Sequence, residues 1–140
     1  MKRFEATTTI QATPETIWQI LTKAEAYPQW DPNMMKLEGT IALGQRITAY
    51  TTLDPGRPFP AKVTVFEPNR QMVWASGLPL GLFKGERTFS LTPNDDGTVT
   101  FKCQEEFTGL LMPIFNRAIP DLTKSFRDFV AGLKKEAEGR

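Results

Sequence analysis

The chain has 140 residues, of which 40% are hydrophobic and 24% are charged, and this composition is typical of one globular domain with a single core. Its 17 basic and 16 acidic residues are interleaved and leave a net charge of +1, so the basic face of a nucleic-acid-binding protein is not expected. The sequence contains no histidine, which excludes Ser-His-Asp and Cys-His catalysis, histidine-ligated metals and haem on a proximal histidine; neither a metal nor a cofactor is expected.

The first 21 residues predict a strand and then a short helix. Residues 2–12 alternate with period two, which favours a β-strand with one apolar face. Thr13 can cap a helix and Pro14 suits its first position, so a short helix is expected to run through residues 17–21.

An aromatic and proline-rich segment follows, Tyr27-Pro28-Gln29-Trp30-Asp31-Pro32. Two prolines within six residues prevent a long helix. The two large rings favour a tight turn or a second short helix that its aromatic side chains anchor in the core.

Residues 34–107 predict a run of strands with no helical period. The candidate strands are 34–39, 46–53, 61–67, 71–77, 84–92 and 98–107. Between them lie turn-forming residues such as Asp54-Pro55-Gly56 and Asn94-Asp95-Asp96-Gly97. Short turns predict an antiparallel meander, because parallel strands need longer crossovers.

The C-terminal segment changes to a helical period. Apolar residues recur at spacings of three and four, at Phe115, Ile119, Leu122, Phe126, Phe129, Val130 and Leu133. Pro113 can open this helix, whereas Pro120 would remove an internal hydrogen bond and is expected to kink the helix or mark its true start.

The sequence shows neither a signal peptide nor a membrane span. The N-terminal charges run directly into polar residues, and no stretch approaches the roughly 20 apolar residues of a spanning helix. A single cysteine, Cys103, excludes an intrachain disulfide and agrees with a reducing compartment. We therefore expect a cytoplasmic protein with no integral membrane segment.

The order of these elements and two sequence motifs of the chain resemble the START-like superfamily, also called SRPBCC. The motifs are Thr13-Pro14-Glu15-Thr16-Ile17-Trp18 and Tyr27-Pro28-Gln29-Trp30-Asp31-Pro32, and Glu106-Phe107-Thr108-Gly109 before the last helix is also similar. Relatives in that superfamily include polyketide cyclases and dehydrases, ubiquinone-binding proteins and birch-pollen-allergen-like proteins. The likeness covers nearly the whole chain.

The resemblance implies an α+β helix-grip fold, with residues 1–140 forming one START-like domain. A curved seven-stranded antiparallel sheet would wrap around a long C-terminal helix, with two short helices between the first and second strands. It also implies an internal cavity that binds or transports a hydrophobic small molecule such as a lipid, isoprenoid, quinone or polyketide-like compound. The alternatives are a polyketide cyclase or dehydratase-like enzyme and a protein-interaction module, because one fold hosts several activities.

Strand parity predicts where one charged pair lies. Phe89, Phe101 and Cys103 fall on an apolar face of the last hairpin, and Arg87 and Glu105 share that parity unless a bulge intervenes. Buried charges need partners, so these two are candidate catalytic or recognition residues: Arg87 would bind an oxyanion or carbonyl, and Glu105 would act as acceptor or base. The alternative is a solvated salt bridge at the mouth of the sheet.

Further candidate ligand contacts come from the expected concave face and the last helix. They are Tyr50, Trp74, Phe89, Phe101, Cys103, Phe115, Ile119, Leu122 and Phe126. Each has core packing as its alternative role.

Residues 78–83 form an unusually apolar connection, Leu78-Pro79-Leu80-Gly81-Leu82-Phe83. Exposed apolar loops mark lids, ligand entrances, homodimer contacts or membrane-surface contacts, and the remaining alternative is a loop folded over the core. Residues 110–115 would form the opposite lip of the same entrance.

Overall fold

A seven-stranded antiparallel sheet forms one layer of the computed structural model, which describes residues 1–140. The strands are β1 (Lys2–Ile10), β2 (Met34–Glu38), β3 (Arg46–Thr51), β4 (Phe59–Glu67), β5 (Gln71–Leu78), β6 (Phe83–Pro93) and β7 (Val99–Thr108). Their order across the sheet is β1-β7-β6-β5-β4-β3-β2, so five hairpins form a meander and β1 pairs with the last strand. The predicted antiparallel sheet of seven strands is confirmed.

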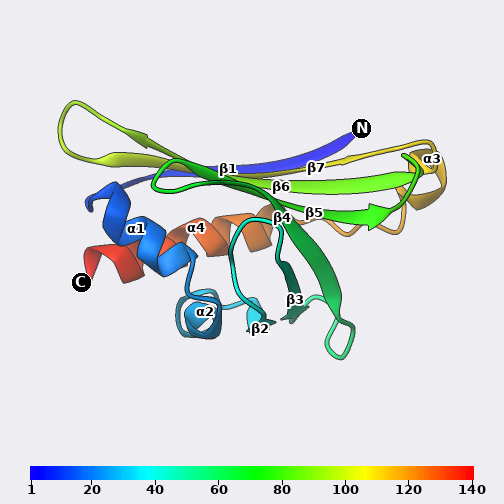
Figure 1. Cartoon of the computed structure of the whole chain (residues 1–140), viewed down its shortest axis with the longest axis horizontal. Helices are drawn as coiled ribbons and strands as arrows, with labels where there is room; N and C mark the ends of the chain where they lie inside the picture. The colour runs from blue at the N-terminus through cyan, green and yellow to red at the C-terminus, as the bar shows by residue number, and fades with distance from the viewer.

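The helices lie on one side of this sheet (Figure 1). They are α1 (Pro14–Leu21), the 3-10 turn η1 (Ala24–Ala26), α2 (Tyr27–Trp30), α3 (Met112–Phe115) and α4 (Thr123–Glu138). The Thr13 hydroxyl caps α1 by accepting a hydrogen bond from the Thr16 amide at 3.1 Å, as the sequence predicts. The two short helices expected between the first strands are α1 and α2.

The C-terminal apolar stripe is divided between two helices. Pro113 stands in the first turn of α3, and Pro120 precedes α4, whose first residue is Thr123. The Asp121 carboxylate accepts a hydrogen bond from the Thr123 amide at 3.0 Å and so satisfies a donor at the start of α4. Pro120 therefore marks the true start of the long helix, the second of its two expected effects.

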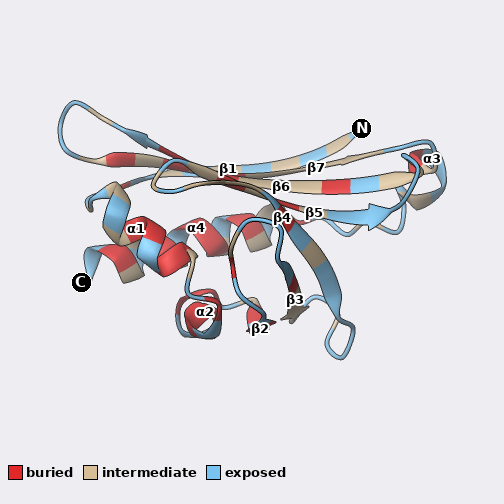
Figure 2. Cartoon of the chain, in the orientation of Figure 1, coloured by how far each residue is buried: buried red, intermediate tan, exposed pale blue.

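The core lies between the concave face of the sheet and α4 (Figure 2). Phe129 of α4 is at its centre, with ring centroids 5.6 Å from Phe89, 6.2 Å from Phe101 and 5.1 Å from Trp30. The helix approaches α2 closely at Gly132, where a Cβ atom would lie 2.0 Å from the Trp30 carbonyl oxygen.

None of the helices combines the length and apolar composition that a membrane span requires.

The long strands extend beyond the N-terminal end of α4 (Figure 1). Helix α3 lies at that far end of the sheet, and residues 116–122 connect it to α4. The ammonium group of Lys2 donates to the carbonyl oxygens of Asn116 and Ile119, each at 3.3 Å. This connection covers the part of the concave face that α4 does not reach.

Candidate functional site

The register of β6 and β7 decides which side chains face α4. Pairing runs without a bulge from Lys84 opposite Thr108 to Pro93 opposite Val99, and it places Arg87 opposite Glu105 and Phe89 opposite Cys103. Directly paired residues share a face of an antiparallel sheet, so the charged pair lies on the same concave face as the buried Phe89. The inward orientation predicted from strand parity is confirmed.

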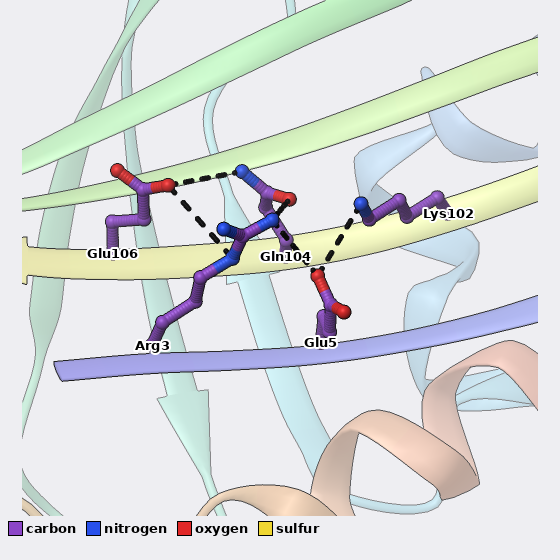
Figure 3. A network of polar contacts seen from close by, with 5 residues as sticks. All are labelled: Arg3, Glu5, Lys102, Gln104 and Glu106. Carbon is purple, nitrogen blue, oxygen red and sulfur yellow. Dashed lines mark hydrogen bonds and ion pairs between the residues drawn. The ribbon is translucent and has the colours of Figure 1, made fainter.

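The opposite face of β1 and β7 carries a separate polar network (Figure 3). Glu5 forms ion pairs with Arg3 at 3.1 Å and with Lys102 at 3.3 Å, and Arg3 also approaches Glu106 at 3.9 Å. These side chains are exposed, where ion pairs contribute about 0–1 kcal/mol. The network therefore lies on the outer surface of the sheet. Its exposed ion pairs can be compared with the enclosed Arg87–Glu105 pair.

The inner pair is enclosed and well aligned. Glu105 Oε1 accepts from Arg87 Nε at 3.1 Å and from Nη2 at 3.0 Å, and the two side chains are 25% and 13% exposed. The guanidinium carbon lies 4.8 Å from the centroid of the Phe126 ring, a cation–π contact with α4. Burial disfavours the charge on Arg87, but the neighbouring acidic groups, the Glu105 carboxylate foremost and Asp31 among them, together hold the pKa of Arg87 above its ordinary value.

A pocket of about 40 Å³ lies beside this pair, between the sheet and α4. Its lining combines apolar and polar side chains from Asp31, Asn33, Met34, Thr51, Leu53, Arg87, Cys103, Ser125, Phe126 and Phe129. Ligand sites usually measure about 300–1,000 Å³, whereas this volume suits water-sized molecules. A pocket is thus present where the cavity was expected, but it is too small for the hydrophobic small molecule that the prediction placed there, because side chains fill most of the interior.

Asp31 is a functional candidate that the sequence analysis did not single out. It is 5% exposed, the only charged residue in the buried core, and it lines the same pocket as Arg87. Its Oδ1 accepts a hydrogen bond from the Asn33 amide at 3.0 Å. Burial raises the pKa of the Asp31 carboxyl. The signal in the sequence was an acidic residue between an anchoring Trp30 and Pro32.

Two other residues near the inner pair are uncharged: Cys103 lines the pocket, and Trp74 does not. Burial raises the pKa of the Cys103 thiol to about 12, so it stays protonated at neutral pH and is no thiolate nucleophile. Trp74 stands opposite Arg87 on β5, and its indole Nε1 is buried without a hydrogen-bond partner.

The remaining predicted contacts either pack in the core or lie at the far end of the sheet, and none of them lines the pocket. Phe89 and Phe101 are fully buried and stack beneath α4, and Leu122 is also buried. Phe115 packs against Phe83 at the far end of the sheet, with ring centroids 5.0 Å apart, and Ile119 lies in the connection that Lys2 holds.

Of the predicted ligand contacts only Cys103 and Phe126 line the pocket, and Tyr50 lies on the opposite side of the sheet. Its neighbour Thr51 lines the pocket and Ile47 is buried, so by alternation Tyr50 faces the other side of β3. There its ring lies 5.9 Å from the Lys36 ammonium, and a hydrogen bond with Glu38 raises the pKa of its phenol.

The far end of the sheet carries an apolar tip formed by Leu78, Leu80, Leu110 and Ile114. Their exposed fractions are 46%, 91%, 77% and 71%. The two loops that carry them are joined by backbone hydrogen bonds from Leu110 to the Gly81 carbonyl at 3.1 Å and from Leu111 to the Leu82 carbonyl at 2.8 Å. The two predicted lips therefore lie side by side.

A larger hollow of about 580 Å³ lies elsewhere, between α2 and the C-terminal half of α4. Its lining is mainly polar and charged, with Gln29, Asp128, Lys135, Glu136 and Arg140 among its residues. It is open to solvent and shares no lining residue with the inner pocket, and it lacks the enclosed apolar surroundings of a small-molecule site.

Comparison with known proteins identifies relatives of the whole chain. The model of the family described as polyketide cyclase / dehydrase and lipid transport matches residues 1–138. No curated protein sequence matches the chain.

Solved structures with the same fold include three that cover nearly all of the chain. An aromatase/cyclase from a Streptomyces species has a TM-score of 0.76 at 14% identity, covering 99% of this chain and 94% of that one. A hypothetical protein from Helicobacter pylori has a TM-score of 0.79 at 13% identity, with coverages of 97% and 88%. The Aha1 dimer from Colwellia psychrerythraea has a TM-score of 0.70 at 19% identity, with coverages of 99% and 97%.

Proposed function

Because the chain belongs to the polyketide cyclase / dehydrase and lipid transport family, we propose that it binds or carries a hydrophobic small molecule between its concave sheet and α4. The observation that carries this proposal is the Arg87–Glu105 pair, which faces inward among apolar side chains beside a pocket. Charged groups are seldom enclosed without a specific reason, and recognition of a polar group on an otherwise apolar ligand is one.

Binding requires the structure to open, because the pocket holds only about 40 Å³. Residues 109–122 are the segment suited to move. Leu110 and Ile114 within it are exposed, and the connection after α3 is held by the two Lys2 hydrogen bonds of 3.3 Å. Met112 and Leu122 are the only buried side chains of the segment, and segments with few buried contacts open at a small free-energy cost. Displacing this segment would extend the pocket along the end of the concave face that α4 does not reach.

Native mass spectrometry of freshly purified protein tests the proposal. A co-purifying apolar adduct, lost after organic extraction, is the expected result. Protein that carries no adduct and also gives no heat on titration with apolar aromatic compounds would contradict the binding function.

An enzymatic version of this function, cyclisation or dehydration of a polyketide-like substrate, is the second candidate. Asp31 favours it, since a buried carboxyl with a raised pKa beside a guanidinium group is typical of acid–base sites. In this version Arg87 donates to a substrate carbonyl oxygen while Asp31 or Glu105 transfers a proton. Arg87→Ala and Glu105→Gln should each lower turnover of a genuine substrate by about 100-fold or more. Unchanged turnover in both would end this mechanism.

We also propose that the apolar tip touches a lipid surface when the ligand is exchanged. The tip adjoins the segment proposed to open, and its two loops are flanked by Arg117 and by Lys84, which also pairs with Glu86 at 3.4 Å. Exposed leucines beside basic residues suit an anionic membrane surface. Leu80→Glu combined with Leu110→Glu should abolish co-sedimentation with vesicles containing phosphatidylserine. A wild-type protein that does not sediment, but forms a dimer that the same changes disrupt, would instead assign the tip to a second copy of the chain.

The location of the protein is part of the proposal. The buried free thiol of Cys103 agrees with a reducing compartment, and we assign the protein to the cytoplasm.

A further inference from the structure

The charges around the inner pocket leave no positive charge free for an anion. Arg87 is the only cationic residue in the lining, and Glu105 engages both its Nε and its Nη2. Asp31 adds a second carboxyl to the same enclosed space. An anionic ligand group that entered here would have to displace Glu105 from Arg87 or lie beside Asp31, and either arrangement is unfavourable where water is largely excluded.

Hydrogen-bonding capacity nevertheless remains unused at this place. Arg87 Nη1 and Asp31 Oδ2 make no hydrogen bond within the protein, whereas Oδ1 of Asp31 is occupied by the Asn33 amide. Next to Arg87 on the concave face, the Trp74 indole N–H is buried and has no partner. The pocket therefore offers a donor from Arg87 and an acceptor from Asp31, with no net positive charge, and the unpartnered Trp74 N–H lies on the strand next to Arg87.

We propose that the hydrophobic guest presents an uncharged hydroxyl group, of a phenol or an alcohol, to this pocket and that carboxylates and phosphates are selected against. This inference rests on the proposed binding function. A hydroxyl group accepts a hydrogen bond from the Arg87 guanidinium and donates one to the Asp31 carboxyl, so it uses both kinds of partner. A ketone or ether uses only the donors. A carboxylate can only accept, and it brings a negative charge to a site that already holds two carboxyl groups.

Three bicyclic probes of similar size separate these possibilities: 2-naphthol, 2-methoxynaphthalene and 2-naphthoate. Their dissociation constants are measured by isothermal titration calorimetry on the wild-type protein at neutral pH. We expect 2-naphthol to bind about tenfold or more tightly than 2-naphthoate, and several-fold more tightly than 2-methoxynaphthalene, which keeps the acceptor but lacks the donor.

A pair of matched variants tests the cause of the selectivity. Glu105→Gln removes the inner carboxylate and releases the charge of Arg87, so 2-naphthoate should gain about tenfold in affinity. Glu106→Gln removes one negative charge from the adjacent residue of β7, which belongs to the outer network (Figure 3), and the affinity ratio should not change. Circular dichroism checks that both variants are folded.

The outcomes distinguish this inference from the function on which it rests. If 2-naphthoate binds the wild-type protein as tightly as 2-naphthol, the preference for an uncharged hydroxyl group is wrong while hydrophobic binding stands. If none of the three probes binds and no adduct co-purifies, both proposals fail. The wild-type comparison decides the matter even if Glu105→Gln does not fold.

Discussion

At the residue scale, the Arg87–Glu105 pair and Asp31 differ from the surface charges because their side chains are largely enclosed. The exposed pairs of the outer network lie in water, whereas Glu105 is only 13% exposed and Asp31 only 5%. In an enclosed site of low dielectric, each hydrogen bond and each missing partner has a larger effect on free energy. Substitutions at these positions should therefore be more informative than those at surface charges.

Asp31 gives a prediction about pH. Because burial raises its pKa above the ordinary value of 3.8, the folded state holds the proton to higher pH than the unfolded state does. Stability therefore falls as pH rises from about 4 through the raised folded-state pKa, by about 1.4 kcal/mol for each unit of difference. Asp31→Asn should remove this decline, so that the variant gains stability relative to wild type across that window. Urea unfolding at a series of pH values measures it.

Asp96→Asn is the matched control for that series. The hydroxyl and amide of Thr98 bond to the Asp96 carboxylate and lower its pKa, so its contribution is present at neutral pH and disappears as pH falls. The control should thus lose stability relative to wild type at neutral pH, the opposite sign to Asp31→Asn. A pH-independent difference between wild type and Asp31→Asn would contradict the assignment.

The sequence predicted some of these residues and not others, for physical reasons. The orientation of Arg87 and Glu105 follows from strand alternation because the β6–β7 hairpin has no bulge. Tyr50 was expected to contact a ligand. The face of β3 on which it lies depends on which residues of the strand, such as Ile47, pack into the core. The burial of Asp31 arises from contacts between α2, β2 and α4, and its place between Trp30 and Pro32 is only a weak local signal of it.

At the scale of elements, Gly132 controls the approach of α4 to α2. Replacing a glycine within a helix with alanine normally stabilises the protein by about 1 kcal/mol. Here the added Cβ would lie 2.0 Å from the Trp30 carbonyl oxygen, so α4 would have to shift. We expect Gly132→Ala to destabilise the protein by about 1–3 kcal/mol in urea unfolding.

The exposed neighbour Ala131 supplies the comparison for Gly132→Ala. Ala131→Gly should lower stability by about 1 kcal/mol through helix propensity alone. Stabilisation by Gly132→Ala would show that the two helices are not in the close contact described above.

Lys2 gives a second prediction at this scale. Its ammonium group holds residues 116–122 through the Asn116 and Ile119 carbonyl oxygens. Lys2→Met should speed amide hydrogen exchange in residues 109–122 and leave the exchange of β6 and β7 unchanged, because only the connection loses partners. Lys102→Met, which removes an ion pair of the outer network, is the control and should not affect that segment. Equal exchange in wild type and Lys2→Met would exclude this restraint.

The length of the last helix was predictable in part. The apolar stripe begins at Phe115, but Pro120 cannot donate the backbone hydrogen bond that a continuous helix needs. The sequence left a kink and a later start as alternatives. The choice between them depends on the packing of α3 at the far end of the sheet. The spacing of apolar residues along a helix does not report such tertiary contacts.

At the scale of the whole molecule, the proposed guest should contribute to stability. A ligand present at 100 times its dissociation constant adds about 2.7 kcal/mol to the free energy of unfolding. For a domain of this size, we expect organic extraction of a co-purifying ligand to lower the melting temperature by about 5–10 °C. Differential scanning calorimetry before and after extraction measures the change. An adduct whose removal leaves the melting temperature unchanged would not be the guest of this site.

The volume of the interior is the global property that the sequence did not predict. Its apolar face and its helix follow from periodicity, but the space between them depends on how far Phe126 and Phe129 insert. Protein interiors are close-packed, so a small rotamer change of either ring alters a pocket of this size.

The pairing of β1 with β7 has a consequence for biosynthesis. The first strand to leave the ribosome finds its neighbour about 100 residues later, and its end is also held by α4, where Lys134 bonds to the Thr9 carbonyl at 2.6 Å. Contacts between such distant segments slow folding, because a long loop must close before they form. Nascent chains therefore keep an unpaired β1 until translation is nearly finished, and chaperones that shield exposed strands should associate with them during that interval.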